Sequence, residues 1–317
     1  MSRSRLKILF AANPEIAIPA LRAVAETFEV VGVLTNPDRP SGRGRNLVPP
    51  PIKEEALNLN LQVIQAEKLT KAVREEVALL GVNFLISFAC GHYFGPKFLD
   101  LFSEGSVNIH PSLLPKYRGS APIQFAILEG DRETGISIQR IAAEIDSGNI
   151  LSSVVFELDG TETTASLSDK VAHMVPSLLI ETLDNLTQGR IEEVVQEHEK
   201  ATFTRLLTKE DGVIDWSEGC QTIDSKIRAF IPWPRATTTF EGVPLAITGV
   251  TGYRLDSEVN HLEPGRVVAL VKKRGLEVVC GDGVIYLSRL HMAQKREMES
   301  SAFVNGNPQI IGTILGS

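Results

Sequence analysis

The chain has 317 residues, of which 43% are hydrophobic and 22% charged, and its formal net charge is −7. This length exceeds one ordinary core and predicts a globular protein of two domains, while the negative charge excludes a surface that coats nucleic acid nonspecifically. The three cysteines are odd in number and widely spaced, so we expect no zinc site, no disulfide framework and a reducing cytoplasm. No apolar stretch approaches the length of a membrane span. Asn13 and Pro14 interrupt the N-terminal apolar run, which favours a strand over a signal peptide.

The first half of the chain alternates apolar runs with amphipathic segments. This alternation predicts an α/β domain built on a doubly wound, mostly parallel sheet. The turn after the first strand, AANPE, lacks the GxGxxG pattern, so dinucleotide binding gains no support. Strands are expected at residues 6–11, 30–35, 62–65 and 83–89, and helices at 16–27 and 71–80.

A stretch rich in proline and glycine, NPDRPSGRGRNLVPPPIK at residues 36–53, interrupts this alternation. It predicts an irregular loop, because proline and glycine disfavour the interior of helices and strands. The stretch is either a solvated basic loop or a loop that binds phosphate, since guanidinium groups pair well with phosphate oxygens. Its cations are Arg39, Arg43, Arg45 and Lys53.

Residues 106–109 predict the end of a strand, at which Pro111 stops the ladder. Because alternate residues of a strand share a face, Asn108 and His110 point the same way. An isolated Asn-x-His is usually the polar end of a strand. Here it leads into an irregular loop, SLLPKYRGSAP, at a strand exit where open α/β sheets place their chemistry.

Asp146 lies in the loop AAEIDSG, between strands predicted at residues 134–141 and 149–156 that form a hairpin. An asparagine can donate to a developing oxyanion, a histidine can donate or move a proton, and an aspartate can hold that histidine in one tautomer. Asn108, His110 and Asp146 together therefore suit attack on a carbonyl group. The set contains no serine or cysteine nucleophile, so we expect the attacking group to come from a substrate.

After a helix predicted at residues 120–128, residues 162–187 predict a long amphipathic helix that kinks or breaks at Pro176. The following residues, 189–208, are polar and charged. They predict a linker between a first domain at residues 1–188 and a second at residues 209–317.

The second domain combines one predicted helix, at residues 221–230, with short strands separated by glycine turns. This pattern predicts a small antiparallel β-barrel of the OB type. We expect Trp216 and Trp233 to pack rather than to stack on bases, and Lys272 and Lys273 to lie on a turn. The predicted strands are residues 237–240, 245–248, 266–271, 276–280 and 284–290.

Two motifs carry a resemblance to a known family. NIHPSLLPKYRGSAP, followed by EIDSGNIL, resembles the signature of the 10-formyltetrahydrofolate-dependent formyltransferases, in which DTG is usual where this chain has DSG. IDWS, IRAFIPWP and GDGVIYL resemble the C-terminal domain of the family. The resemblance implies a Rossmann-like domain followed by an OB-like domain, with catalysis by Asn108, His110 and Asp146 and without a metal.

The resemblance also implies how the formyl donor is bound. The loop at residues 89–99, ACGHYFGPKFL, corresponds to a family loop whose backbone binds the pterin ring. His92 in that loop either lines the folate or is an exposed loop histidine. The implied folate contacts are Ser112, Leu113, Leu114, Pro115, Ala89, Cys90, Gly91, His92, Tyr93 and Ile145.

PDRPSGRGR resembles the loop that family members acting on methionyl initiator tRNA place against the acceptor stem. The implied activity is transfer of the formyl group of 10-formyltetrahydrofolate to the amino group of that tRNA, with no membrane or DNA partner. The alternative is another formyltransferase of the family, such as one acting on an amino sugar. Expected tRNA contacts are Arg39, Arg43, Arg45, Lys53, Lys116, Arg118, Lys272 and Lys273.

Overall fold

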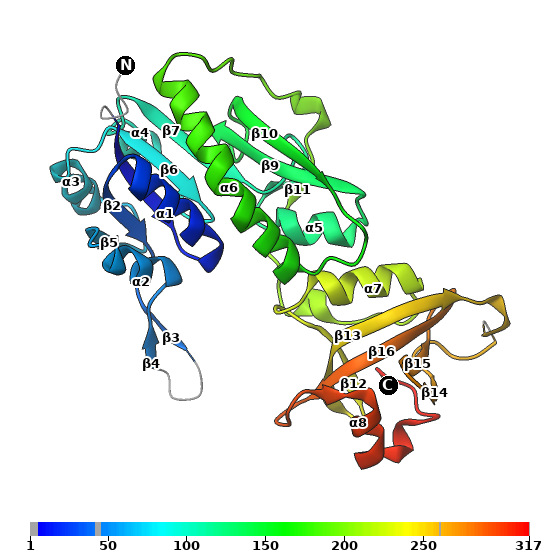
Figure 1. Cartoon of the computed structure of the whole chain (residues 1–317). Helices are drawn as coiled ribbons and strands as arrows, with labels where there is room; N and C mark the ends of the chain where they lie inside the picture. Colours follow the sequence, from blue (N-terminus) through cyan, green and yellow to red (C-terminus); the bar gives the residue numbers. More distant parts are fainter. Residues whose placement is uncertain (1–5, 42–45, 260, 317) are drawn as a thin grey trace. The chain divides into compact units, whose positions relative to one another are not determined.

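The computed structural model describes residues 6–41, 46–259 and 261–316, and its contacts divide the chain into two compact units (Figure 1). The first unit comprises residues 1–122, 133–157 and 168–205, and the second comprises residues 123–132, 158–167 and 206–317. The domain limits predicted from the sequence stay a prediction. Within the described residues, no helix is long and apolar enough to cross a membrane.

The first unit is built on a seven-stranded sheet with the strand order β10-β9-β7-β6-β1-β2-β5. Five neighbouring strands, β7, β6, β1, β2 and β5, run parallel to one another. Strand β9 pairs antiparallel with β7, and β10 pairs antiparallel with β9. The predicted doubly wound, mostly parallel sheet is therefore confirmed. The strands are β1 (Lys7–Ala12), β2 (Glu29–Thr35), β5 (Val63–Gln65), β6 (Phe84–Phe88), β7 (Gly105–His110), β9 (Glu133–Arg140) and β10 (Ile150–Glu157).

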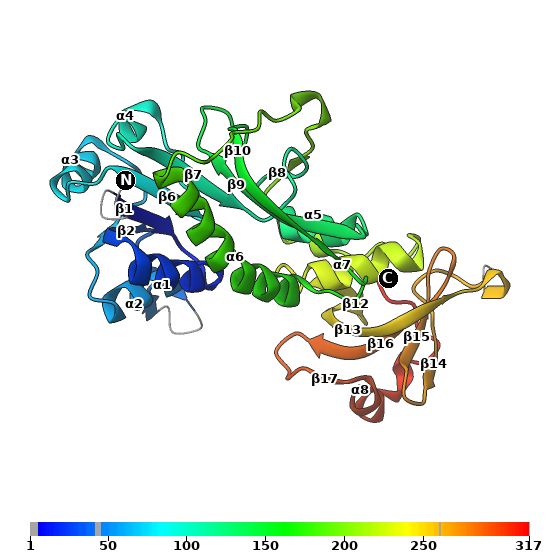
Figure 2. The ribbon, with the colours of Figure 1, turned by 45° about the horizontal axis from the view of Figure 1, so that its top comes forward.

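Helices cover both faces of this sheet, which is why a central strand such as β6 is buried at every position. Leu9, Leu34 and Leu85 share one apolar cluster with Val77 of α3 and Phe98 of α4. Figures 1 and 2 place α1 and α6 together on the other face. The helices are η2 (Glu15–Ala17), α1 (Ile18–Thr27), α2 (Pro51–Asn58), α3 (Lys71–Leu79), α4 (Pro96–Leu99) and α6 (Thr164–Thr187).

Two predictions for the first unit are wrong. The stretch at residues 36–53 is not an irregular loop throughout, because β3 (Arg39–Ser41) pairs with β4 (Asn46–Val48) and α2 begins at Pro51. Proline suits the first helical position, where its missing N–H removes no hydrogen bond.

The second concerns α6, which runs through Pro176 without a break, so the predicted break is wrong and a kink there stays a prediction. Val171, Val175, Leu179 and Leu183 form a buried stripe on both sides of that proline. Each contributes about 1.5–3 kcal/mol by burial, and their sum exceeds the roughly 3 kcal/mol that an interior proline costs.

The segment predicted as a linker is packed against the signature loop. Its β11 (Phe203–Thr204) pairs in parallel with β8 (Arg118–Gly119), and Val194 forms a bridge with Ile150 of β10. A short 3-10 helix, η3 (His198–Lys200), lies between these two contacts. The polar composition of this segment therefore reflects specific hydrogen bonds rather than a simple connector.

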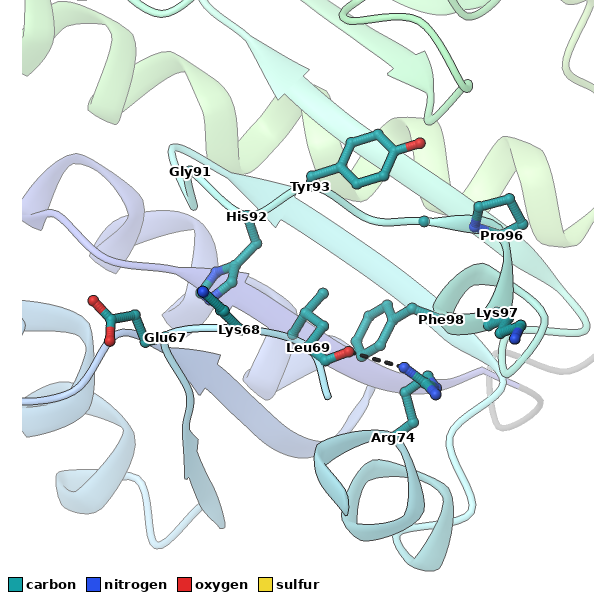
Figure 3. A pocket seen from close by; sticks show the side chains of 11 residues that line it. Glu67, Lys68, Leu69, Arg74, Gly91, His92, Tyr93, Pro96, Lys97 and Phe98 are labelled. Carbon is teal, nitrogen blue, oxygen red and sulfur yellow. Dashed lines mark hydrogen bonds between the residues drawn. The ribbon is translucent and has the colours of Figure 1, made fainter. Parts of the chain in front are cut away.

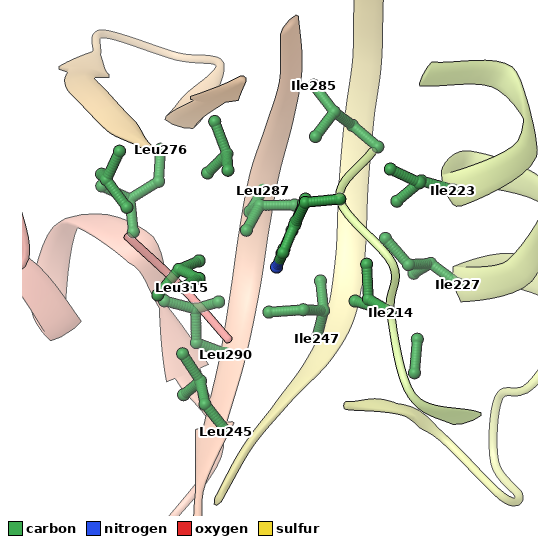
Figure 4. Close-up of a cluster of buried hydrophobic side chains, with 14 of the residues drawn as sticks. Ile214, Ile223, Ile227, Leu245, Ile247, Leu276, Ile285, Leu287, Leu290 and Leu315 are labelled. Carbon is green, nitrogen blue, oxygen red and sulfur yellow. The ribbon is translucent and has the colours of Figure 1, made fainter. Parts of the chain in front are cut away.

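The second unit contains an antiparallel sheet with the order β12-β13-β16-β15-β14, to which β17 adds by pairing with β16. Its core includes Ile223 of α7, Ile247 of β13 and Leu287 of β16 (Figure 4). The strands are β12 (Ala236–Phe240), β13 (Val243–Leu255), β14 (Val267–Val271), β15 (Gly275–Val279), β16 (Gly283–Met292) and β17 (Met298–Glu299). The helices are α5 (Pro122–Leu128), η4 (Glu210–Gly212), α7 (Cys220–Ala229), η5 (Ser257–Val259), α8 (Ser300–Gly306) and η6 (Pro308–Ile310).

The two tryptophans of this unit behave differently. Trp216 is buried, and its indole N–H donates to Thr238 Oγ1 at 3.1 Å, as expected for a core residue. Trp233 is 50% exposed, so it is not a core residue, and the other packing role that the sequence left open for it stays a prediction. It lies between two prolines, Pro232 and Pro234, in the turn that follows α7.

Candidate active site

Strand β7 delivers Asn108 and His110 to one side of its C-terminal end, and the loop between β9 and β10 brings Asp146 to them. Asn108 Nδ2 donates to Asp146 Oδ1 at 3.2 Å, and His110 Nδ1 lies 3.5 Å from Asp146 Oδ2. In the β7–β9 register, Asn108 lies opposite Gln139 and His110 opposite Ser137. The structure thus brings the three predicted residues together, and their catalytic role stays a prediction.

The imidazole of His110 is buried, and its two ring nitrogens face different partners. Its Nε2 lies 2.8 Å from the carbonyl oxygen of Tyr117. Because a carbonyl oxygen only accepts, Nε2 must carry the proton. The carbonyl of Tyr117 therefore sets the tautomer of the neutral ring, and the role expected for Asp146 in orienting His110 stays a prediction. In the neutral ring, Nδ1 faces Asp146 as the atom that can receive a proton.

Asp146 is held by neutral donors from three directions. Gln139 Nε2 donates to its Oδ1 at 2.9 Å, and the backbone N–H of Gly119 donates to its Oδ2 at 2.8 Å. The residue has a φ of 47°, in the left-handed region that aspartate tolerates better than most residues. Gly119 must be glycine, because a Cβ there would collide with the backbone of Thr204. The carboxylate is therefore fixed beside the imidazole and partly open, which suits proton transfer.

The SLLP loop, which carries four of the implied folate contacts, is tied to β9. Ser137 Oγ donates to the carbonyl of Ser112 at 2.7 Å and accepts from the N–H of Leu114 at 3.1 Å. The side chain of Leu113 lies over Gly135, where a Cβ would collide with it. Ser112 itself is buried, and its hydroxyl donates to the carbonyl of Lys116. Ser112 exposes no surface, since its N–H donates to the carbonyl of His110 and its own carbonyl accepts from Ser137. Leu114 is also buried, while Leu113 and Pro115 are half-buried.

The second implied folate loop borders a cavity of about 650 Å³ (Figure 3). Leu69 and Phe98 form its apolar centre, with Arg74 and Lys97 on one side, and Arg74 donates to the carbonyl of Leu69 at 2.9 Å. The remaining lining residues are Glu67, Lys68, Gly91, His92, Tyr93, Gly95 and Pro96. Apolar and aromatic surface with several cations fits an organic anion. Of the other implied contacts, Ala89 is exposed with a φ of 50°, and Ile145 is 59% exposed.

His92 is not the exposed loop histidine that we considered. It is half-buried, with Nδ1 3.1 Å from Cys90 Sγ and Nε2 2.9 Å from the carbonyl oxygen of Ala66. Burial raises the pKa of the Cys90 thiol to about 12, so this sulfur is a neutral packing group. His92 therefore fastens the loop to the segment after β5.

Asn13, which interrupts the N-terminal apolar run, joins the ends of three strands. Its side-chain oxygen accepts from Thr35 Oγ1 at 2.9 Å and from the N–H of Asn36 at 2.8 Å. Its side-chain amide donates to the carbonyl oxygen of Cys90. Asn13 thus fixes the backbone of the implied pterin loop from behind.

The cations predicted to contact tRNA fall into different environments. Arg39 is exposed on β3, and Lys116 is exposed with its ammonium 4.7 Å from the ring centroid of Tyr117. Lys53 is only 21% exposed and pairs with Asp38 at 2.8 Å, and this hydrogen bond holds the pKa of Asp38 below its ordinary value. Arg43 and Arg45 lie outside the described residues. In the second unit, Lys272 and Lys273 are exposed on the β14–β15 turn, as predicted.

The prediction that Arg118 contacts tRNA is wrong. It is 3% exposed, and both its Nε and an Nη donate to Gln196 Oε1, at 3.1 and 2.7 Å. A buried guanidinium cannot meet a phosphate on a tRNA surface, so Arg118 supports the site from within. The sequence analysis also missed Gln139 and Gln196, which are both buried. The signal for Gln139 was a polar residue among the apolar residues of a buried strand.

Two family models and several named proteins match this chain along most of its length. A family model described as "Formyl transferase" matches residues 10–183, and one described as "Formyl transferase, C-terminal domain" matches residues 206–308. A protein of Treponema pallidum named methionyl-tRNA formyltransferase is 38% identical over 319 residues, covering 98% of this chain and 99% of its own. A protein of Listeria monocytogenes with the same name is 37% identical over 302 residues, covering 95% of both chains.

Solved structures with a similar fold include HypX from Aquifex aeolicus in complex with tetrahydrofolic acid. Its TM-score is 0.64 at 17% identity, and the match covers 97% of this chain but 48% of HypX, so this chain spans about half of that protein. An N-formyltransferase from Helicobacter canadensis, in complex with folinic acid and dTDP-3-aminofucose, has a TM-score of 0.63 at 19% identity. That match covers 92% of this chain and 100% of the other. At these identities the likeness concerns the fold alone.

Proposed function

This chain belongs to the formyl transferase family, and we propose that it transfers the formyl group of 10-formyltetrahydrofolate to the amino group of methionyl initiator tRNA. The observation that carries the proposal is the meeting of Asn108, His110 and Asp146 at the end of β7. The names of relatives at 37–38% identity over nearly the whole chain favour methionyl-tRNA as the acceptor over an amino sugar.

The proposed reaction is a direct attack by the neutral methionyl amine on the formyl carbon. A new C–N bond forms, and the carbonyl oxygen becomes an oxyanion. One N–H of the Asn108 amide is directed at Asp146, and the second is available to donate to this oxyanion. The amine becomes acidic as it attacks, and its proton passes to Asp146 or, through it, to His110 Nδ1.

The intermediate collapses when the bond between the formyl carbon and N10 breaks. The proton held between His110 and Asp146 returns to N10, so tetrahydrofolate leaves as a neutral amine. While that proton is on Nδ1, the imidazolium places a positive charge beside the oxyanion, and the hydrogen bond from Nε2 to Tyr117 keeps the ring in place. Holding amine and formyl group on one protein supplies a further part of the acceleration.

We place the donor along the two loops that the family resemblance implies. The pterin ring would lie against the backbone at residues 89–93 and beside Leu113 and Pro115, which are half-buried. The cavity in Figure 3 would take the negatively charged tail of the folate, because Lys68, Arg74 and Lys97 line it.

For the acceptor, we propose that residues 1–188 form the catalytic domain and that residues 209–317 contact the tRNA. Arg39 is exposed on the β3–β4 ribbon, and Lys272 and Lys273 are exposed on the turn between β14 and β15. These cations suit phosphate groups of an acceptor stem. The enzyme would act in the cytoplasm, where charged tRNA is made.

The test is a formylation assay with 10-formyltetrahydrofolate on three acceptors in parallel. These are methionyl initiator tRNA, free methionine and a nucleotide-linked amino sugar. Product on the tRNA alone supports donor and acceptor together. Product on the sugar, or hydrolysis of the donor without any acceptor, would overturn the assignment of the acceptor.

A further inference from the structure

The carboxylate of Asp146 stands at the end of a chain of hydrogen bonds that begins at a buried cation. Arg118 donates to Gln196 Oε1 at 2.7 Å, and Gln196 Nε2 lies 3.2 Å from Gln139 Oε1 as a donor. Gln139 Nε2 in turn donates to Asp146 Oδ1 at 2.9 Å. Arg118, Gln139 and Gln196 are 3%, 1% and 4% exposed, so solvent does not compete for these bonds.

Arg118 sets the donor-to-acceptor direction at the start of this series of hydrogen bonds. An arginine side chain has donors only, so the atom of Gln196 that faces Arg118 must be its oxygen. The amide nitrogen of Gln196 then has two hydrogens for three acceptors, which are the carbonyl oxygens of Gly148 and Asp146 and, at the longest distance, Gln139 Oε1. The carboxylate of Asp146 only accepts, so it requires the nitrogen of Gln139 on its side. The guanidinium of Arg118 therefore sets the orientation of the Gln196 amide, while Asp146 Oδ1 and Gln196 Nε2 together set that of the Gln139 amide.

Gln196 also fixes the backbone on which Asp146 is carried. Its Nε2 lies 2.9 Å from the carbonyl oxygen of Asp146 and 2.7 Å from that of Gly148. Asp146 has a φ of 47°, and a Cβ at Gly148 would collide with the backbone of Arg140. The loop therefore follows a tight path that local residues do not impose by themselves, and Gln196 bonds to it from a segment 50 positions away in sequence.

We propose that Gln196 and Gln139 are positioning residues for the reaction, with Arg118 fixing the orientation of the Gln196 amide. They hold Asp146 at the distance from His110 and Asn108 at which a proton can be passed. This inference rests on the proposed function, because it assigns a role within that reaction. It also assigns a catalytic purpose to the segment that follows α6, which the sequence predicts as a linker.

The test is Gln196→Glu. A glutamate keeps the size of the side chain and the acceptor for Arg118, but it replaces the donor with an oxygen that faces three carbonyl oxygens. The Gln139 amide can then turn over, which places its oxygen against Asp146. We expect kcat per folded enzyme to fall about 10²-fold while KM for both substrates stays within about threefold, since the defect lies in the placement of a reacting group. The matched control is Gln188→Glu, the same chemical change at an exposed position of the same unit.

The outcomes separate the two proposals. A Gln196→Glu enzyme with the kcat of the Gln188→Glu enzyme, or one with only a raised KM, would overturn the positioning role. A lower melting temperature with normal kcat per folded molecule would also overturn it, because it would show a purely structural part. If Gln196→Glu does not fold, Gln139→Glu decides by the same criteria. A wild-type enzyme that formylates no tRNA would instead overturn the proposed function.

Discussion

His110 Nδ1 faces Asp146 Oδ2 across 3.5 Å, while the opposite ring nitrogen is bound to a backbone carbonyl at 2.8 Å. The imidazole therefore has one nitrogen for its support and one for chemistry. A proton received at Nδ1 lies between two groups that can both hold it. This arrangement suits a step in which an amine loses a proton and a leaving amine later gains one.

His110→Ala removes the proton acceptor and leaves the donor loops in place. We expect kcat to fall about 10²- to 10⁴-fold, the range for loss of a general acid–base group, with binding of the folate donor largely kept. Steady-state kinetics with initiator tRNA and direct measurement of donor binding check this. Because the side chain is buried, the melting temperature must be measured beside them. Unchanged turnover would remove His110 from the mechanism.

Asp146→Asn tests the carboxylate with little change in shape. The new amide has one oxygen and one nitrogen where the carboxylate has two acceptors. In one orientation the new NH2 group faces the amides of Gln139 and Asn108, and in the other it faces the N–H of Gly119. In both cases a donor faces a donor. We expect kcat to fall at least about 10²-fold, with a smaller change in KM for the donor. A rise in the donor KM with normal kcat would mean that Asp146 binds rather than moves protons.

The fold of the first unit follows from signals that are local in sequence. The buried run at Phe84–Phe88 and the β9–β10 hairpin are apolar or alternating, because each packs against a core on at least one face. The β3–β4 ribbon has no such signal, since Leu47 and Val48 are 67% and 49% exposed. Its pairing depends on backbone hydrogen bonds that apolar periodicity does not report.

Only some residues of the candidate site can be predicted from the sequence. Asn108, His110 and Asp146 stand in motifs that can be recognised along the sequence. Gln196 stands in a charged segment without a motif, and it reaches its partners 48 to 78 positions away. Arg118 looks like a surface cation in sequence, and only the packing of β11 beside β8 shows why it is buried. Contacts of this kind depend on the tertiary fold.

We predict that the glutamate tail of the folate donor binds in the cavity shown in Figure 3. Lys97 is exposed and lines this cavity. If the tail lies here, each added glutamate brings another carboxylate toward this ammonium group. We expect Lys97→Ala to raise KM for a triglutamyl donor about two- to fivefold, the effect of one exposed ion pair, and to change KM for the monoglutamyl donor less. Added salt should reduce the difference. Lys71→Ala, an exposed cation on α3 that does not line the cavity, is the control. An equal effect on both donors would show that the tail lies elsewhere.

The next prediction is that no cysteine thiol acts as a nucleophile in the reaction. Burial raises the pKa of Cys90 to about 12, so at pH 8 only about one molecule in 10⁴ carries the thiolate. Cys220 and Cys280 are also buried, and the neighbouring Cys220 thiol and burial raise the pKa of Cys280. We expect iodoacetamide at pH 8 to leave the native enzyme active and unmodified by mass spectrometry. After unfolding it should modify all three cysteines. Rapid loss of activity with one label at Cys90 would contradict this assignment.

The last prediction concerns the acceptor. Arg39 is 68% exposed at the side chain, whereas Lys53 pairs with Asp38 and is 21% exposed. If the basic stretch at residues 36–53 binds the acceptor stem, Arg39→Ala and Arg43→Ala should each raise KM for initiator tRNA, while kcat stays close to the wild-type value. Each should also lower the slope of log KM against log salt by about one, the change expected for one lost phosphate contact. Arg190→Ala, an exposed arginine of the first unit, is the control. A small methionyl analogue without an acceptor stem should be formylated equally by all of these enzymes. An equal loss on that analogue would mean that the ribbon acts on the reaction site and not on the RNA.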